Sequence, residues 1–169
     1  MSFRSYPISR FKGVANLFLG QHSSLLSDDY SLSLPLKFRE ILSDSIYVTK
    51  GFDNNLLILT TSVFETISQH ISSLNITDPI ARLLMRLIFG SACLLEIKPK
   101  NKFHLPKNMV EFAGLKGRVV IVGQGEYCEI WSQENWCEQE SRLFNADENS
   151  KRFSGLNVTT RQPEFLSIK

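Results

Sequence analysis

Cysteine and histidine are scarce in this chain of 169 residues, which has three of each. Cys93, Cys128 and Cys137 form no Cys-x-x-Cys pair, whereas a structural zinc site needs four clustered nitrogen or sulfur ligands. Their odd number also disfavours a disulfide framework, so we expect reduced thiols in an intracellular protein. The histidines belong to no metal or nucleophile motif, and no glycine-rich phosphate loop is present. We therefore expect no metal, no cofactor and no catalytic residues.

Long hydrophobic runs are missing as well. The most apolar stretch, residues 80–97, contains Arg82 and Arg86, whose charges would be costly in the hydrocarbon of a bilayer. The N-terminus has no long apolar segment and no small-residue cleavage site, which a secretion signal requires. These absences predict a cytoplasmic protein with no membrane contact.

Neither sign of charge is in large excess, since 19 Lys and Arg residues oppose 17 Asp and Glu residues and the net charge is +2. The 43% hydrophobic and 21% charged fractions are ordinary for a globular protein and exclude disorder of the whole chain. The length suits one domain, or one built from two similar halves. So small a net charge does not indicate a nucleic-acid function, which depends on where the charges lie.

Similar landmarks recur along the chain at a nearly constant spacing. Pro35 and Pro106 each follow a leucine. The same spacing, longer by a single position, separates three further pairs: Gly51 from Gly123, Ile58 from Ile130, and Phe64 from Trp136. We interpret this order as a duplication with a small insertion rather than a coincidence.

Each copy contains the same predicted elements: a short strand, helical turns opened by the proline, and a hairpin. The predicted segments are strands 32–34 and 103–105, and hairpins 46–49 with 56–59 and 119–122 with 127–131. The apolar residues of the helical turns are Phe38, Ile41 and Leu42 in the first copy, and Met109, Phe112 and Leu115 in the second. Because a few short strands leave exposed edges, the copies should interleave and close one small β-barrel, with the linker helices outside.

Two helices are predicted between the copies. Ser62 and Glu65 have the spacing of a capping box at the start of the first. Asp78 as N-cap and Pro79 at the first helical position open the second, which ends at Gly90. The predicted apolar face of this second helix consists of Ile80, Leu83, Leu84, Leu87 and Ile88.

Several runs of residues form a recognisable pattern in chain order. They are Phe18-Leu19-Gly20 and residues 32–40, 77–82, 86–92, 113–115, 120–123 and 129–132. Over residues 17–140 or so, the chain resembles the MraZ family of bacterial transcriptional regulators. The resemblance implies an α+β, mainly β fold of two SpoVT-AbrB type domains. In that fold the two internal repeats form a pseudo-two-fold, double-psi-like β-barrel with swapped hairpins and flanking helices.

The resemblance also implies a domain organisation. The expected parts are an N-terminal extension without fixed structure over 1–16, a first SpoVT-AbrB type domain over 21–67, a helical linker over 68–90, a second such domain over 91–134, and a C-terminal helix with a loose tail over 135–169. The extension contains no acidic residue, so it could be a basic arm that reaches DNA. Alternatively, the natural chain begins at Leu17.

By the same resemblance, the protein is a ring-like homo-oligomer that binds repeated sites in double-stranded promoter DNA. Those sites would lie upstream of a cell-division and cell-wall gene cluster, and the regulator would be cytoplasmic and nucleoid-associated. The sequence departs from the family in one respect. Each family copy carries Asp, three residues and then Arg before the strand that leads to the proline. Ser27 and Ser31 hold those positions in the first copy, and Lys98 and Lys102 in the second.

The second copy therefore contains the stronger candidate site. Its lysines, with no acidic residue between Ile97 and Val110, are Lys98, Lys100, Lys102 and Lys107. They would neutralise phosphates and release counterions. Lys102 lacks the planar fork with which Arg reads guanine, so it should favour phosphate contact. The alternative is a solvated turn, or an edge strand that lysines protect from aggregation.

The first copy offers Lys37 and Arg39 as further DNA-binding candidates. Asp28 and Asp29 add negative charge nearby, and an ion pair of a basic residue with Glu40 or Asp28 is an equal alternative. For the whole protein, the main alternative is an oligomeric interaction scaffold of the same fold that has lost DNA reading. Another is a barrel that binds a small molecule, which would need an apolar pocket with converging polar groups.

Overall fold

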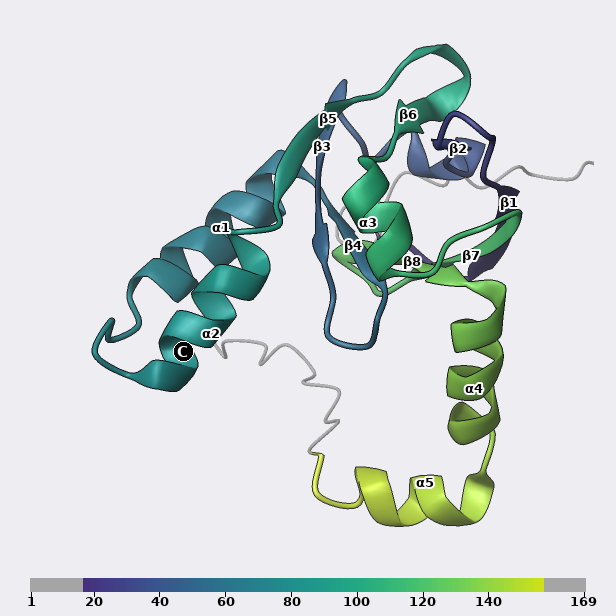
Figure 1. Ribbon diagram of the computed structural model, residues 1–169. Helices are drawn as coiled ribbons and strands as arrows, with labels where there is room; N and C mark the ends of the chain where they lie inside the picture. Colours follow the sequence, from purple (N-terminus) through teal and green to yellow (C-terminus); the bar gives the residue numbers. More distant parts are fainter. Residues whose placement is uncertain (1–16, 157–169) are drawn as a thin grey trace, which may run out of the picture. The chain divides into compact units, whose positions relative to one another are not determined.

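A computed structural model describes residues 17–156, which fall into two units, one ending at Trp136 and one beginning at Cys137 (Figure 1). The expectations for residues 1–16 and for the tail beyond residue 156 lie outside the described residues. No helix within residues 17–156 is long and apolar enough to cross a bilayer. In the same range, no three His, Cys, Asp or Glu side chains gather as metal ligands would.

The described residues form short strands and helices that alternate along the chain. The strands are β1 (Gln21–Leu25), β2 (Ser31–Ser33), β3 (Ser45–Lys50), β4 (Leu56–Leu59), β5 (Cys93–Glu96), β6 (Lys102–His104), β7 (Arg118–Gly123) and β8 (Tyr127–Ser132). The helices are α1 (Thr61–Ser72), α2 (Pro79–Ile88), α3 (Lys107–Phe112), α4 (Gln133–Leu143) and α5 (Ala146–Phe153), with 3-10 turns η1 (Leu36–Phe38) and η2 (Pro99–Asn101). The predicted strands, proline-opened turns and hairpins are confirmed to within one residue or two, whereas β1 and β5 were not predicted.

The strands of the two halves pair with each other. One antiparallel sheet has the order β1-β7-β8-β4-β3-β5, and β2 and β6 form a separate two-stranded ribbon (Figure 1). At the centre of the sheet Leu57 opposes Glu129, a pair with the same spacing as Gly51 and Gly123. In the ribbon Leu32 opposes Phe103, a pair with the same spacing as Pro35 and Pro106. Each centre therefore pairs a residue with its own counterpart in the other copy.

The α+β, mainly β fold class is confirmed, but the closed barrel is not. Strands β1 and β5 each have one partner among the described strands and form the two edges of the larger sheet. Strands β2 and β6 are three residues long and, within the described residues, pair only with each other. Such short strands offer too few backbone groups to join the sheet edges into one continuous ring of hydrogen bonds.

The hydrophobic core lies between one face of the six-stranded sheet and the ribbon with its helical turns. Leu32 and Phe103 point inward from the ribbon, each 1% exposed. The predicted apolar residues Phe38 and Met109 are buried in the same cluster. Cys128 is also in the core, and its burial raises the pKa of its thiol. The core thus fastens the ribbon to the sheet.

The linker helices lie against the other face of the sheet at β3. Tyr47 of β3 stacks on Phe64 of α1, with ring centroids 3.9 Å apart. Thr60, not Ser62, is the N-cap of α1, because its side chain accepts the hydrogen bond of the Val63 N–H. The predicted cap of α2 is confirmed: the side chain of Asp78 accepts from the Ile80 N–H at 2.8 Å.

The predicted apolar face of α2 is only partly covered. Ala81 and Ile88 are buried, whereas Ile80 is 70% exposed and Leu83 is 58% exposed. The helix packs against α1 and β3 on one side only, and the width of its apolar face exceeds that contact. An apolar stripe therefore remains at the surface of this chain.

The end of the described chain differs from the single predicted helix. Helix α4 begins in the first unit, where Trp136 packs edge-on against Trp131 at 5.6 Å. A second helix, α5, follows in the second unit. It begins because the side chain of Asn145 accepts from the Glu148 N–H and so caps a new helix.

Candidate nucleic-acid interface

The outward face of the β2–β6 ribbon is polar because its strands alternate. Leu32 and Phe103 point into the core, so their neighbours along each strand face away from it. Opposite Ser33 lies Lys102, and opposite Ser31 lies His104. Since the strands are antiparallel, these two pairs occupy opposite ends of the ribbon.

Two loops lead into the ribbon, residues 27–30 before β2 and residues 98–101 before β6. Each loop is closed by a backbone hydrogen bond across the same number of residues. The Ser27 N–H donates to the Ser31 carbonyl at 2.9 Å, and the Lys98 N–H donates to the Lys102 carbonyl at 2.6 Å. The two loops thus close with the same bond.

The last residue of each loop has an unusual backbone. Tyr30 and Asn101 have φ values of 62° and 55°, in the left-handed region. This conformation lets each carbonyl reach the other half: the Leu34 N–H donates to the Asn101 carbonyl at 3.1 Å, and the Leu105 N–H donates to the Tyr30 carbonyl at 3.0 Å. The reciprocal bonds hold both loops at fixed positions on the ribbon.

Three of the predicted lysines lie together on the second loop and the start of β6. Lys98, Lys100 and Lys102 are all exposed, and no described carboxylate forms an ion pair with them. Lys100 is at the loop's tip and adopts a left-handed backbone with φ 63°. We call these three residues the basic loop. It presents three positive charges at one end of the ribbon.

The other predicted basic residues have partners of their own. Lys107, at the start of α3, lies 3.6 Å from Glu111 in an exposed ion pair. Lys37 is exposed, and its ammonium lies 5.7 Å from the centre of the Phe38 ring. The structure does not bring these two residues into the basic loop.

Arg39 is tied to the loop that follows η1. Its guanidinium forms an ion pair with Asp44 at 2.7 Å and donates to the Ser43 carbonyl at 2.9 Å. The predicted alternative of an ion pair was correct in kind, but the partner is Asp44 rather than Glu40 or Asp28. The turn through residues 40–43 brings Asp44 back to the arginine, and residue spacing alone carried no signal of that turn.

The first loop carries the opposite charge. Asp29 accepts hydrogen bonds from the Ser31 hydroxyl at 2.8 Å and the Ser31 N–H at 3.1 Å. These two bonds, with a smaller contribution from nearby His104, hold the pKa of Asp29 below its usual value. The Ser31 hydroxyl also lies 3.3 Å from His104 Nδ1 across the ribbon. The outward face is therefore acidic at one end and basic at the other.

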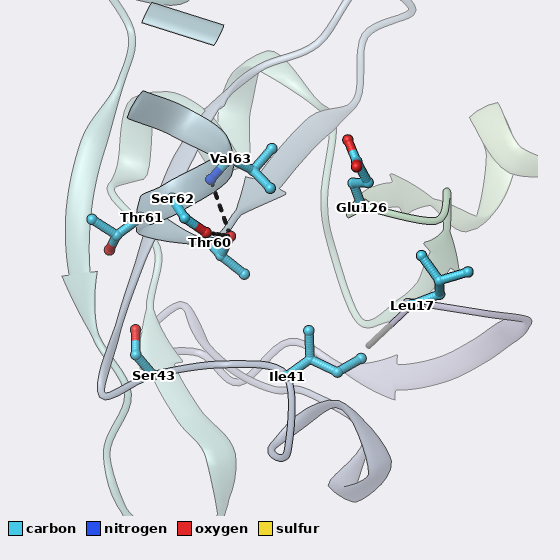
Figure 2. A pocket seen from close by; sticks show the side chains of 8 residues that line it. All are labelled: Leu17, Ile41, Ser43, Thr60, Thr61, Ser62, Val63 and Glu126. Atoms are coloured by element: carbon cyan, nitrogen blue, oxygen red, sulfur yellow. Dashed lines mark hydrogen bonds between the residues drawn. The ribbon is translucent and has the colours of Figure 1, made fainter. Parts of the chain in front are cut away.

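An open cleft of about 460 Å³ lies at the start of α1 (Figure 2). Figure 2 shows its lining residues: Leu17, Ile41, Ser43, Thr60, Thr61, Ser62, Val63 and Glu126. The hydrogen bonds drawn there join the Thr60 hydroxyl to the Val63 N–H, which it caps, and to the Ser62 hydroxyl. The lining is hydroxyl groups, a few aliphatic side chains and one carboxylate, with no cation among them.

The chain is thus an α+β protein built from two similar halves, whose strands pair with each other and whose β2–β6 ribbon is charged on its outward face. Comparison with known proteins identifies its family. The family model described as "MraZ protein, putative antitoxin-like" matches residues 88–155. The chain is 33% identical over 127 residues to "Transcriptional regulator MraZ" of Thermomicrobium roseum, which covers 75% of this chain and 89% of that protein.

Two further relatives of the same name agree. The protein of Herpetosiphon aurantiacus is 35% identical over 120 residues, covering 71% of this chain and 84% of that protein. The protein of Dictyoglomus thermophilum is 34% identical over 133 residues, covering 79% of this chain and 88% of that protein. The chain belongs to the MraZ family, as the sequence resemblance predicted.

Proposed function

We propose that this chain is a DNA-binding transcriptional regulator, and that the basic loop is its contact with DNA. The single observation that carries the proposal is the position of Lys98, Lys100 and Lys102, exposed and without a described ion-pair partner on a loop fixed to the core. Relatives that bear the name of a transcriptional regulator support the same role.

The chemistry of the basic loop favours phosphate over base edges. Each lysine that meets a phosphate releases condensed counterions, and this entropic gain dominates affinity for DNA. An ammonium is a flexible point charge, whereas the bidentate fork that reads guanine belongs to arginine. We infer that Lys102, at the family's arginine position, contributes affinity more than sequence discrimination.

Sequence-specific binding then requires several chains. We propose that the protein assembles into a homo-oligomer, ring-like as in the family resemblance, so that several basic loops engage tandem promoter repeats. Weak single contacts become a strong multivalent one through effective concentration. Exposed apolar side chains favour a second copy as their cover, and they are Ile80 and Leu83 of the α2 stripe, Ile76 before α2, and Leu94 on edge strand β5.

The finer assignments follow from the family. We propose that the DNA sites lie upstream of a cell-division and cell-wall gene cluster and that the protein acts in the cytoplasm on the nucleoid, without enzymatic activity. We also retain 21–67 and 91–134 as the two SpoVT-AbrB type domains, with interleaved strands that correspond to swapped hairpins. Lys37, Arg39 and Lys107 stay secondary candidates, because two of the three already have ion-pair partners.

A gel shift with the chain's own upstream region tests the function. We expect retardation at low salt that weakens steeply as salt is added, and a weaker shift for Lys100→Ala with Lys102→Ala on every DNA sequence. The matched control is Lys116→Ala with Lys151→Ala, which removes the same charge outside the basic loop. Light scattering on the same samples reports the oligomer.

Two results would count against the proposal. Absence of retardation at low salt by an intact oligomer would contradict DNA binding and support an interaction scaffold. Equal binding by the Lys100 and Lys102 double variant and the wild-type protein would place the DNA contact on another surface.

A further inference from the structure

We propose that each chain contacts DNA through the basic loop alone, and that the side chains of the equivalent first loop exclude it from the phosphate backbone. This inference rests on the proposed function and makes it more specific. It predicts an asymmetric DNA contact from a nearly symmetric pair of halves.

The backbone does not distinguish the two loops. Both close with one hydrogen bond, between Ser27 and Ser31 in the first and between Lys98 and Lys102 in the second. Both end in a left-handed residue whose carbonyl accepts from the opposite half. Since Leu32 opposes its counterpart Phe103 at the centre of the ribbon, the loops lie at equivalent places on its two ends. Any functional difference must come from the side chains.

The side chains differ in charge at the equivalent positions. The counterparts, matched at the spacing of Leu32 and Phe103, are Ser27 and Lys98, Asp28 and Pro99, Asp29 and Lys100, Tyr30 and Asn101, and Ser31 and Lys102. The first loop therefore carries two negative charges where the second carries three positive ones. The reversal is complete at the tip, where Asp29 stands in place of Lys100.

The negative charge of the first loop is a built feature. Asp29 receives two hydrogen bonds from Ser31, whose hydroxyl also meets His104 of the opposite strand. These bonds hold the carboxylate at a fixed place on the outward face, where it would repel a phosphate as a lysine there would attract it. Ser31 stands where the second loop has the cation Lys102, and it donates hydrogen bonds to the carboxylate of Asp29. The first loop thus disfavours DNA at short range.

One contact per chain has a consequence for the DNA site. A symmetric protein would place its two equivalent loops on the DNA at a separation set within one chain. Here successive contacts come from different chains, so their spacing is set by the oligomer rather than by the two halves. The phosphate contacts on DNA should recur once per subunit.

Introducing the lysines of the second loop into the first loop tests the inference. Asp29→Lys with Ser31→Lys installs in the first loop the two cations found at Lys100 and Lys102. The matched control, Glu65→Lys with Thr66→Lys on α1, changes the net charge by the same amount. Affinity for the upstream DNA is measured by fluorescence anisotropy over a series of salt concentrations, and the quantity compared is the slope of log affinity against log salt. Circular dichroism and light scattering check that fold and oligomer are retained.

We expect the slope of the Asp29 and Ser31 variant to steepen by about 1 to 2, since each added phosphate contact contributes about 0.9. The control on α1 should leave the slope near that of the wild-type protein. A milder variant, Asp28→Asn with Asp29→Asn, should raise affinity at low salt by removing repulsion. This variant also provides the test of the inference if the lysine variant fails to fold.

The outcomes separate the inference from the function on which it rests. Wild-type protein that binds no DNA refutes the proposed function. If the wild-type protein binds DNA but the lysine variant has the same salt slope as its α1 control, the charge of the first loop does not exclude it from DNA. That result refutes the inference and is compatible with the proposed function. Weaker binding by the Asp28 and Asp29 variant would also overturn the inference, because it would show that the first loop contributes to the contact.

Discussion

Gly123→Ala should destabilise the fold strongly, because a methyl group there meets backbone atoms. A Cβ at residue 123 would lie 2.3 Å from the carbonyl oxygen of Phe18 and 2.4 Å from its carbon. No rotamer change can relieve a clash with backbone. Retreat in the other direction is opposed by β8, where Cys128 pairs with Gly123. The segment around Phe18 must therefore move away by about 1 Å, from the clash distance toward ordinary van der Waals contact.

The expected loss follows from what that segment holds in place. Phe18 is fully buried and packs edge-on against Phe38 at 5.0 Å, and burial of such a ring contributes about 1.5–3 kcal/mol. Its backbone exchanges two hydrogen bonds with Gly125, at 2.7 and 3.0 Å, each with a net value of about 0.5–1.5 kcal/mol. Gly123→Ala should lose part of the free energy of this burial and of these two hydrogen bonds. It should regain about 0.4–1 kcal/mol because alanine makes the unfolded chain stiffer. The expected destabilisation is about 2–4 kcal/mol.

Urea unfolding followed by tryptophan fluorescence measures this loss, since Trp131 lies on β8 beside the perturbed strand. The control is Gly125→Ala. Its Cβ would meet no atom within 4 Å, and its φ of 82° adds only conformational strain, of about 1–2 kcal/mol. A Gly123→Ala variant within about 0.5 kcal/mol of wild type, the usual effect of a surface substitution, would refute the reasoning. So would a Gly123→Ala variant that is more stable than Gly125→Ala.

Two further substitutions test the half-buried carboxyl group of Glu129 and a helix cap. Burial chiefly, and then the charge of Asp53, raise the pKa of Glu129, against hydrogen bonds led by that of Trp131. The wild-type protein should therefore lose stability as the pH rises above 4.5, the ordinary pKa of a glutamate, toward the higher folded pKa. The stability of Glu129→Gln relative to wild type should therefore be greater at neutral pH than at mildly acidic pH. Urea midpoints of both proteins at the two pH values measure this difference. Asp78→Ala removes the cap of α2 and should cost about 1 kcal/mol, measured by thermal unfolding.

These two predictions have clear contrary results. An equal difference between Glu129→Gln and wild type at the two pH values would mean that the carboxyl group titrates alike in the folded and unfolded chain. For the cap, Asp78→Asn keeps an accepting oxygen and should retain most of the stability. Equal losses for the Ala and Asn variants would contradict the role assigned to the Asp78 side chain.

Local signals predicted the elements that depend on a few neighbouring residues. Asp78 followed by proline identified the start of α2, because a cap and its N–H partner lie close together in the chain. The hairpin of β7 and β8 followed from apolar strands around a turn with Gly123 and Gly125. In each case the interaction that decides the conformation is short in sequence.

Elements that exist only through a distant partner were missed. Strand β1 has a polar, serine-rich sequence and alternates between exposed and half-buried positions. It is a strand because it pairs with β7 of the second copy, with Gln21 opposite Val122. Strand β5 follows the predicted end of the second helix at Gly90, where no strand was predicted, and it is a strand because Ile46 of β3 pairs with Leu95.

The same division holds for the candidate site. The cluster of lysines was visible in the sequence because its members are close together in the chain. Its exposure, its rigid support and the position of the acidic first loop at the other end of the ribbon were not visible. Arg39 shows the limit, since its pairing with Asp44 depends on a turn that residue spacing did not specify.

The amino-acid sequence by itself determined the duplication, the hairpins, the cap of α2 and the location of positive charge, since each depends on composition, on order along the chain or on neighbouring residues. Only the tertiary structure decided which strands pair, that the sheet stays open at β1 and β5, and which charges face outward together. Those outcomes depend on hydrogen bonds and packing between residues of different copies, far apart in the chain. Their free energies come from the joint burial of both halves, which no local pattern records.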